Sequence, residues 1–322
     1  MTSSQIKKKI TVALSEIPFF KFLSQTEAVQ EEITERHLNE IFKRFCFRIY
    51  PHGKTICHEG HIGKEFFIVL NGNVTVLRDG RKVATLRPGS WFGEIAVFKW
   101  TRRTATCIAS NERRKGGGGG SSSTPPPTEV LSLSSKAFTE LSTEQPWLQL
   151  AMADLCHQRT GDMLSCISFF KKVPKLQLEL LGSLFNYKSV KTNTIVCHEG
   201  DDAREFYILI QGQVKVMALS DEKGGAMKEL ATVDSISWFG EIALIQDCQR
   251  TATVETSEDS TLLVLSKENF HRFLRVVPSL AETMREHMGE RISQMIRTFE
   301  VIDYFLYFTI NYYYLILFFS MG

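Results

Sequence analysis

The strongest constraint on the fold of this 322-residue chain is that its second half repeats its first half. Short stretches of identical residues recur in the same order, and the separation between copies grows from 140 to 147 residues along the chain. The clearest pairs are CHEG at 57–60 and 197–200, WFGEIA at 91–96 and 238–243, and RTAT at 103–106 and 250–253. Because each copy is long enough to bury a core of its own, the repeat predicts two tandem domains of one fold.

The two copies differ in length at polar segments, where insertions cost little. The second copy has extra residues near 220–226, where the first copy turns tightly at Asp79-Gly80. The first copy alone carries a run of glycine, serine and proline, which we interpret as a flexible loop at 111–128 inserted within the domain and not as the interdomain linker. The predicted boundaries are 17–145 for the first domain, 146–300 for the second and 301–322 for a hydrophobic C-terminal tail.

Short apolar segments separated by glycine fill each copy. Residues 66–70 are apolar, 71–73 have the composition of a turn, and 74–77 resume the apolar pattern, which predicts strand, turn and strand. Closely spaced short strands are typical of an antiparallel barrel or jelly roll. Helical patterns cover 138–157, with a break near Pro146, and 280–299. The predicted fold is mainly β with flanking helices, present twice.

The composition argues against several classes of protein. A net charge of +2, from 38 basic and 36 acidic residues, gives no reason to expect nucleic acid as a partner. The seven cysteines are scattered without a CxxC pair, so neither a disulfide framework nor a zinc site is expected. The N-terminal residues contain no long apolar core, so a secretory signal is not expected and a reducing, cytoplasmic setting fits best.

The repeated unit that carries chemistry is a glycine, a glutamate directly after it and an arginine nine residues after the glutamate. The unit consists of Gly93, Glu94 and Arg103 in the first copy and of Gly240, Glu241 and Arg250 in the second. A glycine that enters a short helical turn lets backbone N–H groups face a small anion. Arginine supplies the countercharge and can hold two phosphate oxygens, whereas the carboxylate accepts hydrogen bonds from hydroxyls. A cyclic sugar-phosphate satisfies all three groups together.

A single copy could also be explained by an ordinary salt bridge between Glu94 and Arg103. The equal spacing in both copies, within the same frame of glycine and aromatic residues, favours the binding site over the salt bridge.

The sequence FGEIA, followed at this spacing by RTAT, resembles the phosphate-binding cassette of cyclic-nucleotide-binding domains. Two such cassettes in tandem resemble the regulatory region of cGMP-dependent protein kinase and the regulatory subunit of cAMP-dependent protein kinase. The resemblance covers about 17–291 and implies two jelly-roll β-barrels. It implies that the glutamates bind the ribose 2′-hydroxyl, and that the arginines bind the cyclic phosphate with help from backbone N–H groups of Ala96, Ala105, Ala243 and Ala252.

Base preference is predicted from Thr104 and Thr251, which directly follow the two arginines. A threonine oxygen can accept a hydrogen bond from the 2-amino group of guanine, which adenine lacks. The resemblance agrees, because cGMP-dependent kinases have threonine at this position. We therefore expect a receptor that binds cGMP more tightly than cAMP. We expect neither a cofactor nor a catalytic residue. The competing interpretation is that these threonines are present because threonine favours β-strands.

The sequence departs from those kinases, since no kinase domain follows and no basic inhibitor sequence precedes the first domain. The partner could therefore be a protein kinase catalytic subunit or another effector. A kinase regulatory subunit that responds to cAMP is an alternative function. Two more hypotheses are a scaffold with non-binding domains and a barrel metalloenzyme that uses His52, His58 and Glu59. The second copy keeps His198 but has no other histidine before His271, so this arrangement does not repeat. No catalytic triad is recognisable either, so enzymatic activity is not expected.

The C-terminal residues 304–321 are uncharged and rich in aromatic side chains. Their number is just enough to cross a bilayer, which predicts membrane contact through 301–322 as a C-terminal anchor. The run of tyrosines argues against this, since tyrosine prefers membrane interfaces, and a gene-model artefact is a second interpretation of the tail.

Overall fold

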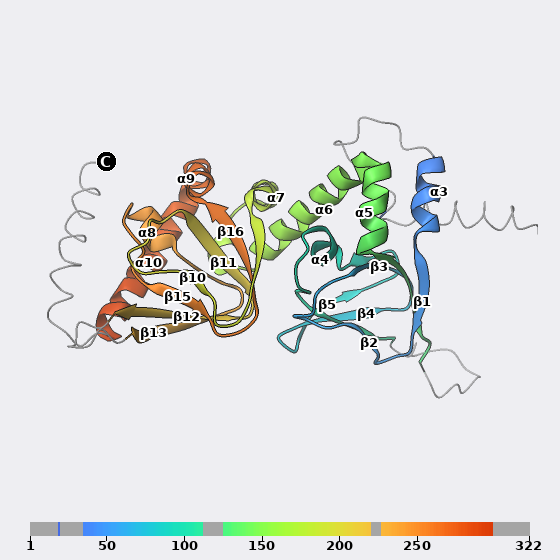
Figure 1. The fold of residues 1–322 in the computed structure, drawn as a ribbon, viewed down its shortest axis with the longest axis horizontal. Helices are drawn as coiled ribbons and strands as arrows, with labels where there is room; N and C mark the ends of the chain where they lie inside the picture. Colours follow the sequence, from blue (N-terminus) through green and yellow to red (C-terminus); the bar gives the residue numbers. More distant parts are fainter. Residues whose placement is uncertain (1–18, 20–34, 112–124, 220–226, 299–322) are drawn as a thin grey trace, which may run out of the picture. The chain divides into compact units, whose positions relative to one another are not determined.

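The computed structural model describes Phe19 and residues 35–111, 125–219 and 227–298 (Figure 1). The chain divides into two compact units, Met1–Arg159 and Thr160–Gly322. Each unit holds two four-stranded antiparallel sheets of the same strand pattern, so the repeat in the sequence is a repeat of the fold. The expectation of a mainly β, duplicated jelly roll with flanking helices is confirmed.

The first unit is built from the strand orders β1-β8-β3-β6 and β2-β7-β4-β5. The strands are β1 (Cys46–Tyr50), β2 (Thr55–Cys57), β3 (Glu65–Asn71), β4 (Val74–Arg78), β5 (Arg81–Leu86), β6 (Trp91–Phe92), β7 (Thr106–Ala109) and β8 (Thr128–Ser134). Side chains of β3 alternate between two cores, as the pleat of a strand requires. Phe67 and Val69 lie in the core with residues of β4 and β7, whereas Phe66 and Ile68 pack with the helices.

The second unit repeats this arrangement with the strand orders β14-β11-β16-β9 and β10-β15-β12-β13. The strands are β9 (Asn186–Val190), β10 (Ile195–Cys197), β11 (Glu205–Gln211), β12 (Gln213–Leu219), β13 (Met227–Asp234), β14 (Ser237–Phe239), β15 (Thr253–Thr256) and β16 (Ser260–Ser266). Phe206 and Ile208 of β11 face the helices, and Tyr207 and Leu209 face the other core. The central strand of each unit is therefore buried on both faces.

Helices flank the sheets of each unit (Figure 1). They are α3 (Glu35–Lys43), α4 (Glu94–Phe98), α5 (Ser135–Glu144), α6 (Pro146–Leu164), η1 (Ser168–Phe170), α7 (Lys175–Leu184), α8 (Glu241–Ile245), α9 (Lys267–Val276) and α10 (Pro278–Thr298). The Ser134 side chain accepts a hydrogen bond from the Ala137 N–H and so caps α5. The predicted break near Pro146 is present as the boundary between α5 and α6, and the predicted C-terminal helix is α10.

The predicted tight turn at Asp79-Gly80 is present between β4 and β5. Both residues have positive φ, 48° and 70°, and Arg78 pairs with Arg81 across the turn. Left-handed backbone at both central positions fits the right-handed twist of the flanking strands, which explains why a glycine stands there.

Three predicted segments fall wholly or mainly outside the described residues. These are the inserted loop, of which 112–124 is not described, the extra residues at 220–226, and the tail 301–322. Strands β7 and β8 flank the inserted segment, and both belong to the first unit. Within the described residues, no helix is long and apolar enough to cross a membrane.

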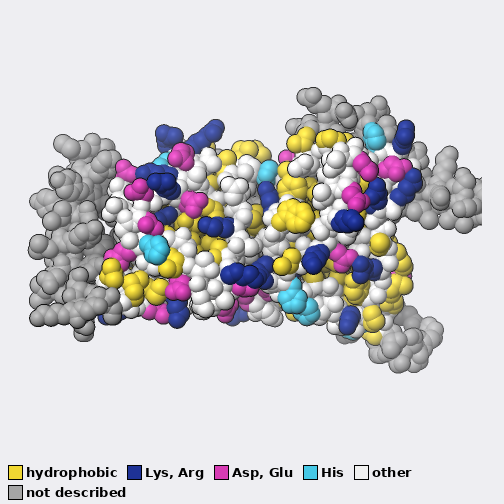
Figure 2. All heavy atoms as spheres, in the orientation of Figure 1, with side chains coloured by type: hydrophobic (Ala, Val, Ile, Leu, Met, Phe, Trp, Pro, Cys, Tyr) yellow, Lys and Arg dark blue, Asp and Glu magenta, His cyan; other side chains and the backbone are white. Residues whose placement is uncertain are grey.

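The described surface carries charges of both signs. On the face that Figure 2 shows, lysine and arginine side chains alternate with aspartate and glutamate over both units. This mixed pattern matches the small net charge of the sequence.

Candidate ligand-binding site

Each cassette glycine stands at the start of a short helix. Gly93 precedes α4 and Gly240 precedes α8, with φ of 84° and 86° in the left-handed region. A Cβ built on Gly93 would overlap the Arg103 guanidinium, and one built on Gly240 would lie 2.7 Å from Nη1 of Arg250. Glycine is therefore required twice over, by the backbone conformation and by the closeness of the arginine.

The two arginines are held in the same way in both units. Arg103 is 6% exposed, and its guanidinium donates to the carbonyl oxygens of Gly93 at 3.1 Å and Glu65 at 2.5 Å. Arg250 is 5% exposed and donates to Gly240 at 3.0 Å and to Glu205 at 2.5 Å. These carbonyl oxygens carry no formal charge, and they orient each guanidinium.

An aromatic ring lies beneath each of these guanidinium groups. Arg103 lies 5.5 Å from the ring centroid of Phe67, and Arg250 lies 5.4 Å from that of Tyr207. A ring face attracts a cation, so both arginines are oriented before any ligand arrives.

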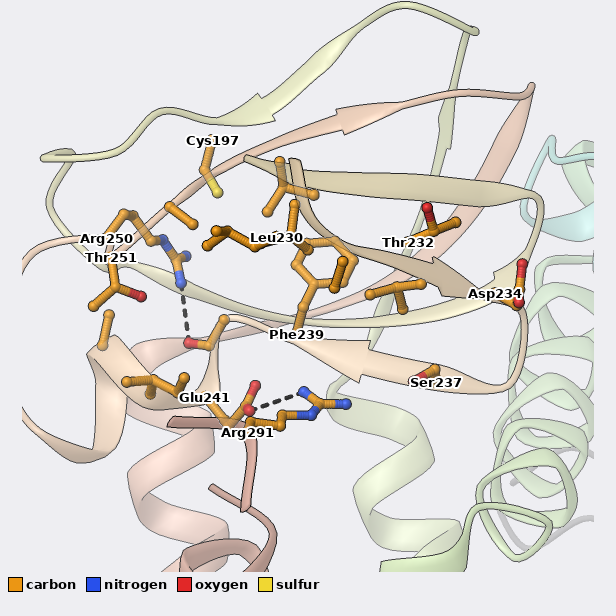
Figure 3. A pocket seen from close by; sticks show the side chains of 18 of the residues that line it. Cys197, Leu230, Thr232, Asp234, Ser237, Phe239, Glu241, Arg250, Thr251 and Arg291 are labelled. Carbon is orange, nitrogen blue, oxygen red and sulfur yellow. Dashed lines mark hydrogen bonds and ion pairs between the residues drawn. The ribbon is translucent and has the colours of Figure 1, made fainter. Parts of the chain in front are cut away.

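A cavity of about 470 Å³ opens beside the cassette of the second unit (Figure 3). Figure 3 shows Arg250 and Thr251 at one end, Asp234 at the opposite end, and Glu241 along a wall between them. The cavity is lined by all six residues that the sequence predicts for this site, which are Gly240, Glu241, Ala243, Arg250, Thr251 and Ala252. Its size is in the range of small-molecule sites.

The first unit brings its predicted residues together in the matching way. Ala96 is buried in α4, as Ala243 is in α8. A Cβ built on Gly63 would touch both Ala96 and Arg103, which places the helix beside the arginine. Thr104 and Ala105 follow Arg103 directly and lead into β7, and the Thr104 carbonyl accepts a hydrogen bond from Arg78 at 3.3 Å.

The two glutamates are almost fully buried, and each forms an ion pair with an arginine of a later helix. Glu94 is 4% exposed and lies 3.4 Å from Nε of Arg159 on α6. Glu241 is 2% exposed and lies 2.9 Å from Nη1 of Arg291 on α10. A simple salt bridge between Glu94 and Arg103 therefore fits poorly, since Arg159 holds the carboxylate and backbone carbonyls hold Arg103.

One carboxylate oxygen of Glu94 stays without a hydrogen-bond partner. Oε2 is buried and has no partner among the described residues. Burial raises the pKa of the Glu94 carboxyl, and the Arg159 guanidinium partly opposes this rise. A ligand hydroxyl that donated to Oε2 would satisfy this oxygen and favour its charged form.

Arg159 and Arg291 are site residues that the sequence patterns above did not single out. Each also lies over a tryptophan ring, Trp91 at 5.7 Å and Trp238 at 4.7 Å. A signal for them exists, because Pro146 and Pro278 begin the two helices and an arginine follows each proline thirteen residues later.

The repeated CHEG stretch has a structural role in both units. The Glu59 carboxylate accepts from the Asp79 N–H at 3.0 Å, and Glu199 accepts from the Leu219 N–H at 2.9 Å. Each glutamate thus ties the turn at a strand end to a neighbouring hairpin. Nδ1 of His52, a residue of the metalloenzyme hypothesis, accepts from the Asn111 N–H. No group of three metal-ligating side chains occurs among the described residues.

Comparison with known proteins finds a family model that matches part of both copies. The family model described as "Cyclic nucleotide-binding domain" matches residues 47–113 and 187–276, which include both cassettes. The cAMP-dependent protein kinase regulatory subunit of Yarrowia lipolytica is 29% identical over 69% of this chain and 52% of its own length. The cGMP-dependent protein kinase of Toxoplasma gondii is 24% identical over 86% of this chain and 26% of its own length.

A solved structure with a similar fold is that of the regulatory domain of Toxoplasma gondii PKA with cAMP. It is 18% identical, covers 90% of this chain and 98% of its own, and has a TM-score of 0.41. This chain spans about half the length of the Yarrowia relative, and a smaller share of the Toxoplasma kinase.

Proposed function

We propose that this chain, both units of which match the cyclic nucleotide-binding domain model, is a receptor that binds one cyclic nucleotide in each domain. The observation that supports this most is the buried arginine held on backbone carbonyls, Arg103 in one domain and Arg250 in the other. A buried guanidinium that neutral oxygens orient gains most from an anion that binds to it.

The proposed roles follow from the chemistry of each group. The arginine binds the cyclic phosphate, with the backbone N–H groups of Ala96 and Ala105, or of Ala243 and Ala252, completing the cradle. Glu94 and Glu241 accept a hydrogen bond from the ribose 2′-hydroxyl, for which the buried Oε2 of Glu94 is suited. Thr104 and Thr251 accept from the guanine 2-amino group, which favours cGMP over cAMP.

The arginines provide the direct test. Arg103→Ala and Arg250→Ala each leave a buried phosphate without its partner, which costs roughly 2–5 kcal/mol, or about thirty-fold to several-thousand-fold in affinity. Titration calorimetry with cGMP and cAMP is expected to show two sites in the wild type, one in each single variant and none in the double variant.

Two exposed arginines serve as controls, Arg81 in the first domain and Arg272 in the second. Replacing either with alanine is expected to leave both sites intact. Wild-type affinity in the double variant Arg103→Ala, Arg250→Ala would contradict the proposal.

We further infer that the chain acts as a regulatory protein and not as an enzyme. Relatives from several fungi carry the name cAMP-dependent protein kinase regulatory subunit, which supports a protein kinase catalytic subunit as partner. A kinase regulatory subunit that responds to cAMP is the second candidate function.

A further inference from the structure

Two cysteines of the first domain face each other on neighbouring strands beside the cassette. Cys57 ends β2 and Cys107 lies in β7, and the two residues are direct partners in the antiparallel ladder. The register of the ladder shifts between Thr55 and Cys57, and Cys57 lies opposite Cys107 after this shift. Directly paired residues of an antiparallel ladder typically have Cα atoms about 4.5–5.5 Å apart, within the range that a disulfide requires. Little movement therefore separates the two thiols from an S–S bond.

The second domain lacks this pair and provides a built-in comparison. Cys197 stands where Cys57 stands in the first domain, but its partner across the ladder is Val254. The pair is thus a property of one domain and not of the repeated fold.

The surroundings of Cys57 favour its reaction with an oxidant. Cys57 is partly buried, whereas Cys107 is buried at 4% exposure. The neighbouring Cys107 thiol and the nearby Arg103 guanidinium lower the pKa of the Cys57 thiol, although burial opposes them. Cys57 is therefore the attacking sulfur and Cys107 the resolving one.

We propose that Cys57 and Cys107 form a reversible disulfide under oxidation by a peroxide, and that this modification weakens ligand binding in the first domain alone. The Cys57 thiolate attacks one peroxide oxygen, the O–O bond breaks, and the released hydroxide takes up the thiol proton as water, leaving a sulfenic acid. The Cys107 sulfur then attacks the Cys57 sulfur, and its proton leaves with the sulfenic hydroxyl as a second water. Two thiols lose two electrons, and one peroxide becomes two waters.

The link to the ligand passes through Ala105. The Cys57 thiol lies 4.0 Å from the Ala105 carbonyl oxygen, and Ala105 stands between Arg103 and β7. An S–S bond removes the Cys57 S–H group and turns its sulfur toward Cys107, so the Ala105 carbonyl loses this contact. This second part rests on the proposed function, since it assumes that the first domain binds a nucleotide.

The first experiment tests the disulfide without any nucleotide. The full chain is treated with equimolar hydrogen peroxide, blocked with a maleimide, and digested with trypsin without reduction. We expect a linked pair of peptides, 55–64 with 104–113, that a dithiol separates. Cys107→Ser is expected to stop at a sulfenic acid that dimedone traps, and Cys57→Ser is expected to give no link.

Cys197→Ser is the matched control and is expected to leave the link unchanged. Absence of the linked peptides from the oxidised wild type, or a link from Cys57 to another cysteine, would overturn the proposal. Because the wild type alone decides this outcome, a variant that folds poorly does not obscure it.

The second experiment measures cGMP affinity at the first site, with Arg250→Ala removing binding at the second. Oxidation is expected to weaken binding about three- to tenfold, the loss expected for one displaced hydrogen bond, and a dithiol should restore it. Equal cGMP affinity in the reduced and the oxidised protein would overturn the proposed effect on ligand binding, but it would not contradict the disulfide itself. If the reduced variant binds neither cGMP nor cAMP, the proposed function fails at this site and the coupling fails with it, whereas the linked peptides still establish the disulfide.

Discussion

The proposed preference for one base depends on single side chains, Thr104 and Thr251. Each directly follows a cassette arginine, and Thr251 lines the cavity of the second domain next to Arg250. A hydroxyl at this position can reach a purine whose phosphate lies on the arginine. The proposed preference for cGMP over cAMP therefore depends on one neutral hydrogen bond at each site.

We predict that Thr104→Ala and Thr251→Ala each narrow the ratio of cGMP to cAMP affinity at their own site. One neutral hydrogen bond contributes about 0.5–1.5 kcal/mol, so each change should be about two- to tenfold. Competition binding with both nucleotides measures it. Thr106→Ala, two residues further along in β7, serves as the control. A wild-type preference for cAMP would contradict the guanine interpretation and leave the cyclic-nucleotide interpretation in place.

Sequence patterns single out candidate site residues that are close together in the chain and miss partners that are far apart. Gly93, Glu94 and Arg103 lie close together in the chain and recur with equal spacing, so their pattern is visible. The contact between Glu94 and Arg159 joins residues 65 apart, and its counterpart between Glu241 and Arg291 joins residues 50 apart. Unequal separations hide such a pair from a search for fixed spacing.

At the scale of secondary-structure elements, α10 packs on the core through Leu280 and Met284, and the Arg291 side chain joins it to the cassette of the second domain. Arg291 of α10 donates to the Trp238 carbonyl at 2.8 Å and to Glu241 at 2.9 Å, and its guanidinium lies over the Trp238 ring. A ligand that engages Glu241 must therefore share this carboxylate with the helix. Changes at the site and changes in the position of α10 are linked through that one group.

We predict that Arg291→Ala loosens α10 and destabilises the second domain by about 1–2 kcal/mol, since it leaves Glu241 buried without its cation and the arginine itself is partly exposed. Hydrogen exchange should rise in α10, and the unfolding midpoint of this domain should fall. Arg285→Ala, at an exposed arginine of the same helix, is the control. Unchanged exchange in α10 would show that the ion pair does not hold the helix.

Hairpins and helix boundaries were the elements most visible in the sequence. Asp79-Gly80 predicted a tight turn because a left-handed backbone needs such residues, and Pro146 predicted the break between α5 and α6 because proline cannot continue a helix. The short helices α4 and α8 carry no periodicity of their own over five residues, and only the preceding glycine indicated them.

At the scale of the whole molecule, the proposed function is that of a regulatory receptor that acts on a partner protein. If the partner is the catalytic subunit of cAMP-dependent protein kinase, the purified chain should inhibit that kinase, and saturating cyclic nucleotide should relieve the inhibition. Steady-state peptide phosphorylation measures both effects. The double variant Arg103→Ala, Arg250→Ala should inhibit without relief, which separates loss of nucleotide binding from loss of kinase binding. Full kinase activity at saturating wild-type chain would contradict this partner.

Asn111 stands at the start of the inserted segment between β7 and β8, and its side chain holds the two ends of that segment together. Its side chain donates to the carbonyls of Pro126 and Pro127 at 2.6 and 2.9 Å and accepts from the Asn73 N–H at 2.7 Å, so one amide clasps both ends of the insertion. The ladders of β7 and β8 with their neighbouring strands do not include the inserted segment. Each doubling of the length of a loop costs only about 0.6 kcal/mol of stability. A fluorescent protein inserted between 112 and 124 is therefore expected to leave both sheets of the first domain intact.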